Sequence, residues 1–115
     1  MEQRYSEMSV EELQKEMAAL KEKSIKAEQM GMVNELAVYE RKWTMAKAYS
    51  MDPSQFKAGE VYELDATPGE SFKIEYLRGV FAWGNRGSGV REQKDHAAEE
   101  DLEALPISLL GKKLS

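Results

Sequence analysis

The chain has 115 residues, the length of one small domain, which excludes a large multidomain enzyme. Its residues are 42% hydrophobic and 32% charged, a balance that allows a core and is typical of a globular protein. The net charge of -5 disfavours a protein that covers a polyanion with positive charge, and the absence of Cys excludes disulfides and thiolate chemistry.

The first predicted element is a helix over residues 10–30. Apolar or small side chains recur there at steps of three and four, which places them on one helix face: Val10, Leu13, Met17, Leu20, Ser24 and Ala27. Ser9 with Glu12 three residues later predicts a capping box at its start. Gly31 predicts a left-handed cap at its end.

A second helix is predicted between Met32 and Ser50, where the same spacing returns, with Asn34 as a candidate N-cap if residues 31–33 are irregular. It ends at Asp52-Pro53, because a residue before proline avoids helical geometry. A short turn between two helices makes them antiparallel neighbours. Residues 1–52 are therefore predicted to form a helical hairpin.

From Gly59 onward the apolar period is two, which predicts four short strands at residues 61–64, 72–76, 80–83 and 105–109. Residues 67–71 contain Pro68-Gly69 and predict a turn, and Arg78-Gly79 predicts a tight hairpin. Short strands joined by tight turns favour a curled antiparallel sheet or barrel. The polar stretch at 84–104 is predicted to be a loop, with a helical turn at 93–102 as the alternative.

Four segments carry a resemblance to a known family: residues 4–8, 34–49, 79–84 and 103–108. Together, and in this order, they resemble the YfhH-like family of small uncharacterised bacterial proteins. The resemblance implies an α+β fold in which an N-terminal antiparallel helical hairpin packs on a small SH3-like antiparallel β-barrel. We therefore expect one domain over 1–115, with the hairpin at 1–52 and the barrel, including the polar loop, at 56–115. The resemblance implies no activity and no site residues.

The best candidate binding residues follow the third strand. Phe81 and Trp83 alternate with Val80 and Ala82, so one pair faces the core and the other faces outward. A small barrel needs large residues to fill it, which favours the core for the aromatic pair. If the pair faces outward, Trp83 beside Arg86 becomes a candidate for stacking on a base or gripping a peptide.

The basic residues of the hairpin offer a second candidate surface, which includes Arg41 and Lys42. Residues 1–50 hold eight basic and nine acidic side chains, a net charge of -1. Acidic residues dilute the basic ones, so a solvated helix face is the favoured interpretation. The alternative is a phosphate-binding surface.

No catalytic residue, metal site or cofactor is predicted. The single His, His96, could bind a divalent metal together with Asp95, Glu99 and Glu100. However, one His in an acidic loop supplies neither fixed geometry nor an obvious second shell, so a solvated loop is favoured. The glycine-rich run at 84–89 lacks the Gly-Lys-Ser/Thr ending of a phosphate-binding loop. It is therefore interpreted as a flexible hairpin exit.

These observations favour a non-enzymatic interaction or regulatory module whose partner is a protein. The alternative is a nucleic-acid-binding accessory protein that uses Trp83, Arg86 and the hairpin lysines. No apolar run approaches the roughly 18 residues of a membrane span, and charged residues interrupt the first eight positions where a secretory signal needs apolar ones. We expect a cytoplasmic protein without a membrane partner. The sequence permits both a monomer and self-association.

Overall fold

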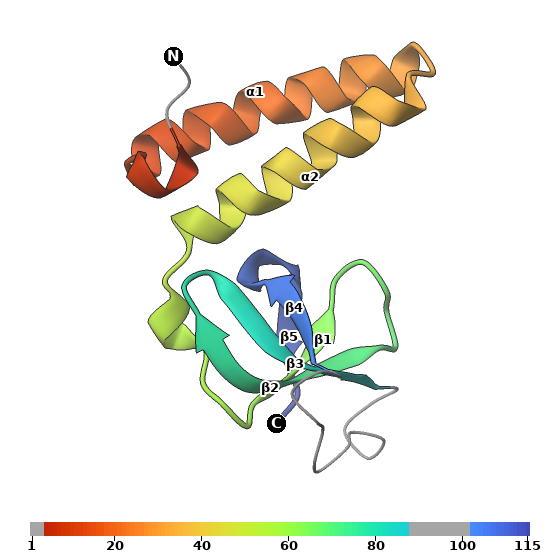
Figure 1. Ribbon diagram of the computed structural model, residues 1–115. Helices are drawn as coiled ribbons and strands as arrows, with labels where there is room; N and C mark the ends of the chain where they lie inside the picture. Colours follow the sequence, from red (N-terminus) through yellow and green to blue (C-terminus); the bar gives the residue numbers. More distant parts are fainter. Residues whose placement is uncertain (1–3, 88–101) are drawn as a thin grey trace. The chain divides into compact units, whose positions relative to one another are not determined.

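A computed structural model describes residues 4–87 and 102–115 of the chain (Figure 1). The chain divides into two compact units, Met1–Met51 and Asp52–Ser115. The first unit is helical and the second is built on a sheet, which confirms the α+β class. Most of the predicted polar loop lies outside the described residues, together with His96 and nearly all of the alternative helical turn at 93–102.

The first helix, α1 (Val10–Gln29), begins and ends where its capping residues predict. The Glu12 amide donates to the Ser9 hydroxyl at 3.1 Å, and the Ser9 amide donates to the Glu12 carboxylate at 3.0 Å. At the other end Gly31 has a φ of +69°, and the Met32 amide donates to the Ala27 carbonyl at 2.8 Å. This 6→1 hydrogen bond, from an amide to the carbonyl five residues earlier, marks a Schellman motif that ends the helix.

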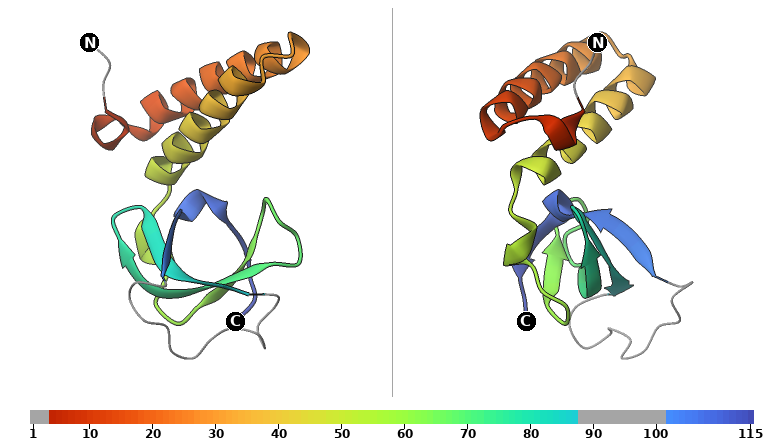
Figure 2. Two further views of the ribbon diagram at one scale, coloured as in Figure 1. Left: turned by 45° about the vertical axis from the view of Figure 1, so that its right-hand side comes forward. Right: turned by 60° about the vertical axis from the view of Figure 1, so that its left-hand side comes forward.

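The second helix, α2 (Val33–Ser50), starts earlier than an Asn34 cap requires. Met32 is the N-cap residue and makes no side-chain cap, so the Asn34 prediction is wrong: the Schellman turn leads directly into α2. After the helix, Asp52 accepts a hydrogen bond from the Ser54 amide and begins the 3₁₀ turn η2 (Pro53–Gln55). Figure 2 shows the two helices side by side, as the predicted hairpin requires.

A small core holds the helices together. Leu13 and Leu20 of α1 meet Ala46 of α2, and all three are at most 3% exposed. The methyl side chain of Ala46 lets the helices approach closely, and larger side chains surround this contact. These partly buried neighbours are Tyr5, Met8, Met17, Tyr39, Trp43 and Tyr49. Tyr5 comes from the short 3₁₀ turn η1 (Tyr5–Glu7), which the periodicity did not predict.

The second unit contains one antiparallel sheet in the strand order β4-β3-β2-β1-β5. Its five strands are β1 (Val61–Leu64), β2 (Ser71–Arg78), β3 (Phe81–Gly87), β4 (Glu103–Pro106) and β5 (Leu110–Lys113). No pairing joins the two edge strands β4 and β5 in the described part of the chain. The sheet is therefore curved but open, and the predicted closed barrel is not confirmed.

The predicted fourth strand at 105–109 is wrong in its second half. Residues Ile107–Leu109 form a 3₁₀ turn, η5, and a further strand, β5, follows it. Pro106 fixes the backbone before the turn, and the Ile107 amide donates to the Val80 carbonyl at 2.9 Å. The alternation of Leu105, Ile107 and Leu109 resembles a strand because the turn also buries Ile107 completely.

The two predicted turns between strands are confirmed. The Glu70 amide donates to the Thr67 carbonyl across Pro68 and Gly69, whose φ is +94°, as in a type II turn. Arg78 pairs with Phe81, so the second connection has only two residues, with Gly79 at a φ of +60°. A glycine in this first position is typical of two-residue hairpins.

Strand β3 continues to Gly87, which corrects the interpretation of residues 84–87 as a loop. Gly84 pairs with Ile74, and a Cβ at Gly84 would collide with the Lys73 carbonyl oxygen. The register shifts between Ile74 and Tyr76, so Glu75 is the extra residue of a β-bulge. The glycine therefore allows a close strand approach.

The inner face of the sheet holds the core of this unit. Phe72, Ile74 and Ile107 are the large side chains with no exposed surface, and Ala82 of β3 is equally buried. Burying a side chain of this size stabilises the fold by about 2 kcal/mol. The register of β3 with its neighbouring strands also determines which of its residues lie on the outer face of the sheet.

Candidate functional site

The aromatic residues of β3 lie on the outer side of the sheet. Ala82 is 0% exposed and pairs with Leu77 and Leu105, whereas the neighbouring Phe81 and Trp83 are partly exposed. The expectation that this aromatic pair fills the core is therefore wrong. The physical reason is the register, which gives the inner position to Ala82, where the large side chains of β2 and η5 already occupy the space.

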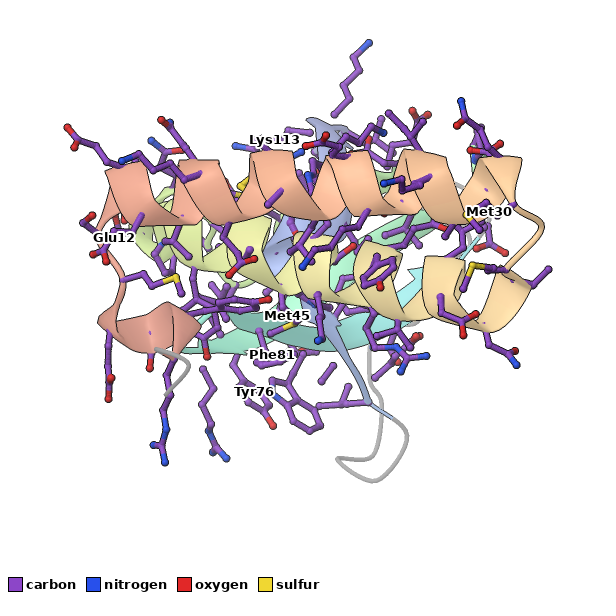
Figure 3. All side chains as sticks on the ribbon, turned by 90° about the horizontal axis from the view of Figure 1, so that it is seen from above. Glu12, Met30, Met45, Tyr76, Phe81 and Lys113 are labelled. Carbon is purple, nitrogen blue, oxygen red and sulfur yellow. The ribbon has the colours of Figure 1, made fainter. Side chains whose placement is uncertain are left out.

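We call the surface made by Tyr76, Arg78, Phe81 and Trp83 the aromatic face. The rings of Tyr76 and Trp83, which pair across β2 and β3, stack with centroids 5.8 Å apart and planes 10° apart. The Arg78 guanidinium carbon lies 5.7 Å from the centre of the Tyr76 ring, within cation-π range. Figure 3 labels the side chains of Tyr76 and Phe81, which come from the paired strands β2 and β3.

Arg86 is not part of the aromatic face. Side chains alternate along a strand, so Arg86 lies on the opposite side of β3 from Trp83. Its guanidinium donates two hydrogen bonds to the Glu103 carboxylate, at 2.9 and 2.8 Å, and a third to Glu70 at 3.1 Å. The structure therefore separates Trp83 and Arg86, which the sequence had suggested as one site.

These ion pairs shift the pKa values of all three groups. The hydrogen bonds to Glu103 raise the pKa of Arg86 further above its ordinary value, although burial opposes this. The same guanidinium lowers the pKa of Glu103. A hydrogen bond from Thr67, followed by the one from Arg86, lowers the pKa of Glu70. The positive charge of Arg86 is thus neutralised within the sheet by β4 and the β1–β2 turn.

Arg41 and Lys42, the candidates on the hairpin, are both exposed on α2. Successive residues on a helix point about 100° apart, so they belong to different faces. Lys42 lines an open groove of about 720 Å³, whereas Arg41 does not.

We call this hollow the basic groove. It is formed by side chains of the N-terminal segment with η1, of α1 and of α2: Arg4, Tyr5, Ser6, Met8, Glu16, Leu20, Lys23, Tyr39, Lys42 and Tyr49. Sequence reasoning missed it because η1 and its Tyr5 were not predicted. The signal on the helices was the recurrence of Tyr39, Lys42 and Tyr49 on one side of α2.

A second groove, of about 400 Å³, is also confined to the hairpin. Its lining contains Lys21 together with Glu28 and Glu40, a net charge of -1. The basic groove carries Arg4, Lys23 and Lys42 against Glu16 alone, a net charge of +2. The two grooves thus differ in the sign of their charge.

Two buried polar atoms of the described residues have no hydrogen-bond partner: Glu75 Oε1, at the bulge, and Asn85 Nδ2, on β3. The described residues contain no group of three or more His, Cys, Asp or Glu side chains that could hold a metal ion. None of the helices described combines the length and apolar character of a membrane span.

Comparison with known proteins places this helical hairpin and open sheet in a family. Residues 3–111 match the family described as "Protein of unknown function (DUF1811)", and the chain belongs to this family. No enzyme family is indicated.

Over 113 residues the chain is 51% identical to the "Uncharacterized protein YfhH" of Bacillus subtilis (strain 168), covering 98% of this chain and 99% of that protein. The resemblance stated from the sequence is confirmed by both matches.

Proposed function

We propose that this protein is a non-enzymatic cytoplasmic interaction module that binds a protein partner through its aromatic face. The observation that carries the proposal is the outward position of Phe81 and Trp83 on β3. Aromatic side chains bury a large area at small entropic cost, and Trp and Tyr are enriched among the residues that dominate binding energy. A partly exposed Trp83 stacked on Tyr76 is a preorganised surface of this kind.

The strand order also supports an SH3-like arrangement, in which a 3₁₀ turn precedes the last strand and that strand returns to pair with the first. Edge strand β4 lies beside the aromatic face, because Trp83 pairs with Ala104 and Phe81 pairs with Pro106. Within the described residues no strand pairs with the outer edge of β4, so a bound segment has both rings and this strand edge available.

A nucleic-acid-binding role is the second candidate, since Arg4, Lys23 and Lys42 line one groove and make no salt bridge within the described residues. The ion pairs of Arg86 count against it, because that side chain is already held by Glu70 and Glu103. Binding of this kind would weaken steeply with salt.

The test is capture from bacterial lysate, with and without nuclease, using the full chain as bait. We expect a protein partner that survives nuclease and is lost with the Trp83→Ala, Phe81→Ala double variant. Val33→Ala is the matched control, since Val33 is an apolar side chain 73% exposed on α2. An empty eluate, or a partner held equally by the double variant, contradicts the proposal, and nuclease-sensitive material promotes the second candidate.

Direct contact is then measured by fluorescence. The chain has two tryptophans, so Trp43→Phe leaves Trp83 as the only reporter. Adding the captured partner should shift the Trp83 emission to shorter wavelength, because binding removes water from the indole. An unchanged spectrum would mean that the partner binds elsewhere.

A further inference from the structure

The basic groove concentrates positive charge in an acidic protein. Three cations and one carboxylate give it a net charge of +2, while the whole chain has -5. Within the described residues, Arg4, Lys23 and Lys42 form no salt bridge, unlike Arg86 and Lys113. Their charges are therefore available to a ligand.

The rest of the lining is aromatic and apolar. Tyr5, Tyr39 and Tyr49 are all half-buried, which fixes their rings while leaving part of each accessible. The Lys23 ammonium lies 6.0 Å from the centre of the Tyr39 ring, so cation and ring share one side of the groove. Buried Leu20 and half-buried Met8 complete a surface that suits an apolar side chain.

We infer that the basic groove binds an acidic peptide segment of a protein partner. Carboxylates of the segment meet Arg4, Lys23 and Lys42, and its apolar or aromatic side chains lie against the three tyrosines. The inference rests on the proposed interaction role, because the ligand is a protein, but it assigns a second surface distinct from the aromatic face.

Charge and size favour a peptide over a nucleic acid. A nucleic acid carries a charge at every nucleotide, and its flanking phosphates would meet a hairpin whose residues 1–50 have a net charge of -1. The groove offers only three cations, and Glu16 lies among them. A peptide can place a few carboxylates beside those cations and keep the remaining length uncharged.

The hairpin supplies its own control for this inference. Lys21 and Lys23 are exposed lysines on the same helix, two residues apart. Lys23 lines the basic groove, and Lys21 lines the second groove of the hairpin, whose net charge is -1. Reversing either charge changes the net charge of the chain equally, so any difference between the two variants reports on the groove.

The experiment is a selection of random peptides displayed on phage against the full-length protein. We expect the selected peptides to combine Asp or Glu with aromatic or aliphatic residues. Synthetic copies should bind Lys23→Glu several-fold more weakly and the Lys23→Glu, Lys42→Glu double variant about tenfold more weakly, while the charge-matched Lys21→Glu binds them as the wild type does. Circular dichroism verifies that each variant keeps its helices.

Three results overturn the inference: no peptide is selected, the selected peptides lack acidic residues, or Lys21→Glu weakens binding as much as Lys23→Glu. A single-stranded oligonucleotide of thymidines is tested in parallel, and tighter binding of that probe, lost in the double variant, also overturns it. Peptides whose binding depends on Trp83 but not on Lys23 and Lys42 overturn the basic-groove inference and support the aromatic face alone. Failure of the two proposals is therefore distinguishable.

Discussion

The helical unit and the sheet unit treat positive charge in opposite ways. In the sheet, Arg86 is held by Glu103 and Glu70, and Lys113 lies 2.7 Å from Glu60. In the hairpin, Lys23 and Lys42 line a groove without a salt bridge among the described residues. In the sheet these two cations hold strands and turns together, whereas the two lysines of the groove are the ones that we propose for a ligand.

The cores of the two units also differ, in the size of the side chains that they bury completely. The sheet buries Phe72, Ile74 and Ile107 completely, and the helices meet through two leucines and an alanine. The hairpin then adds a ring of half-buried aromatic side chains around that small contact. Partly exposed rings still have apolar surface to bury on binding, so packing and recognition can share the same residues there.

The largest expected effect is on the core of the sheet. Phe72→Ala should lower the free energy of unfolding by about 4 kcal/mol, because it leaves a cavity at a fully buried position. Urea unfolding in a Trp43→Phe background measures this through Trp83. Phe81→Ala is the control, and a loss of similar size there would mean that Phe81 belongs to the core.

Next in size is the contrast between two glycines. Gly84→Ala should cost about 3 kcal/mol, because the added Cβ meets the Lys73 carbonyl. Gly31→Ala should cost about 1 kcal/mol, since the space there is open and only the positive φ is unfavourable. Thermal unfolding of both variants tests the order, and equal losses would contradict the close approach of β2 and β3.

A smaller effect on stability is expected for Arg86, which forms ion pairs, and none for Lys42, which forms no salt bridge within the described residues. Arg86→Lys keeps the charge but loses the two-bond contact with Glu103, and should lower the free energy of unfolding by about 1 kcal/mol. Lys42→Ala should leave stability unchanged. A double-mutant cycle with Glu103→Gln measures the Arg86 coupling, and zero coupling would remove the contrast between the units.

The smallest effect is the pH dependence of the Glu60 ion pair. Hydrogen bonds from Lys113, from the Tyr62 hydroxyl and from the Lys57 amide lower the pKa of Glu60 from 4.5 to about 2. A lowered pKa in the folded state stabilises the fold above pH 4.5, and this contribution is lost as the pH falls toward 2.

Glu60→Gln should therefore flatten the dependence of stability on pH in that window, as should Lys113→Met. Urea unfolding at a series of pH values provides the measurement. A slope that both variants leave intact would assign the acid sensitivity to other carboxylates.

Much of the hairpin was predictable because its signals are local. Ser9 and Glu12 satisfy each other within one turn, and Gly31 supplies a backbone conformation that few other residues adopt. Pro68-Gly69 fixes its turn in the same way. Each of these signals acts over a few residues, so the sequence alone contains the whole interaction.

The sites were less predictable because they depend on distant partners. Arg86 finds Glu70 and Glu103 at separations of 16 and 17 residues, which no spacing rule connects. The outward position of Trp83 follows from a register that the alternation leaves open. Likewise, nothing in the pattern of residues 4–8 predicts that Tyr5 packs beside the helices.

The pairing of β5 with β1 has a consequence for the order of folding. The hairpin and the β1–β2–β3 pairings connect neighbours in the chain, so they close short loops and form quickly. Leu64 must instead find Leu110, across nearly the whole sheet unit. That late step controls when β1 stops being an exposed edge, so β1 is the segment in which partly folded chains are most prone to pair with one another.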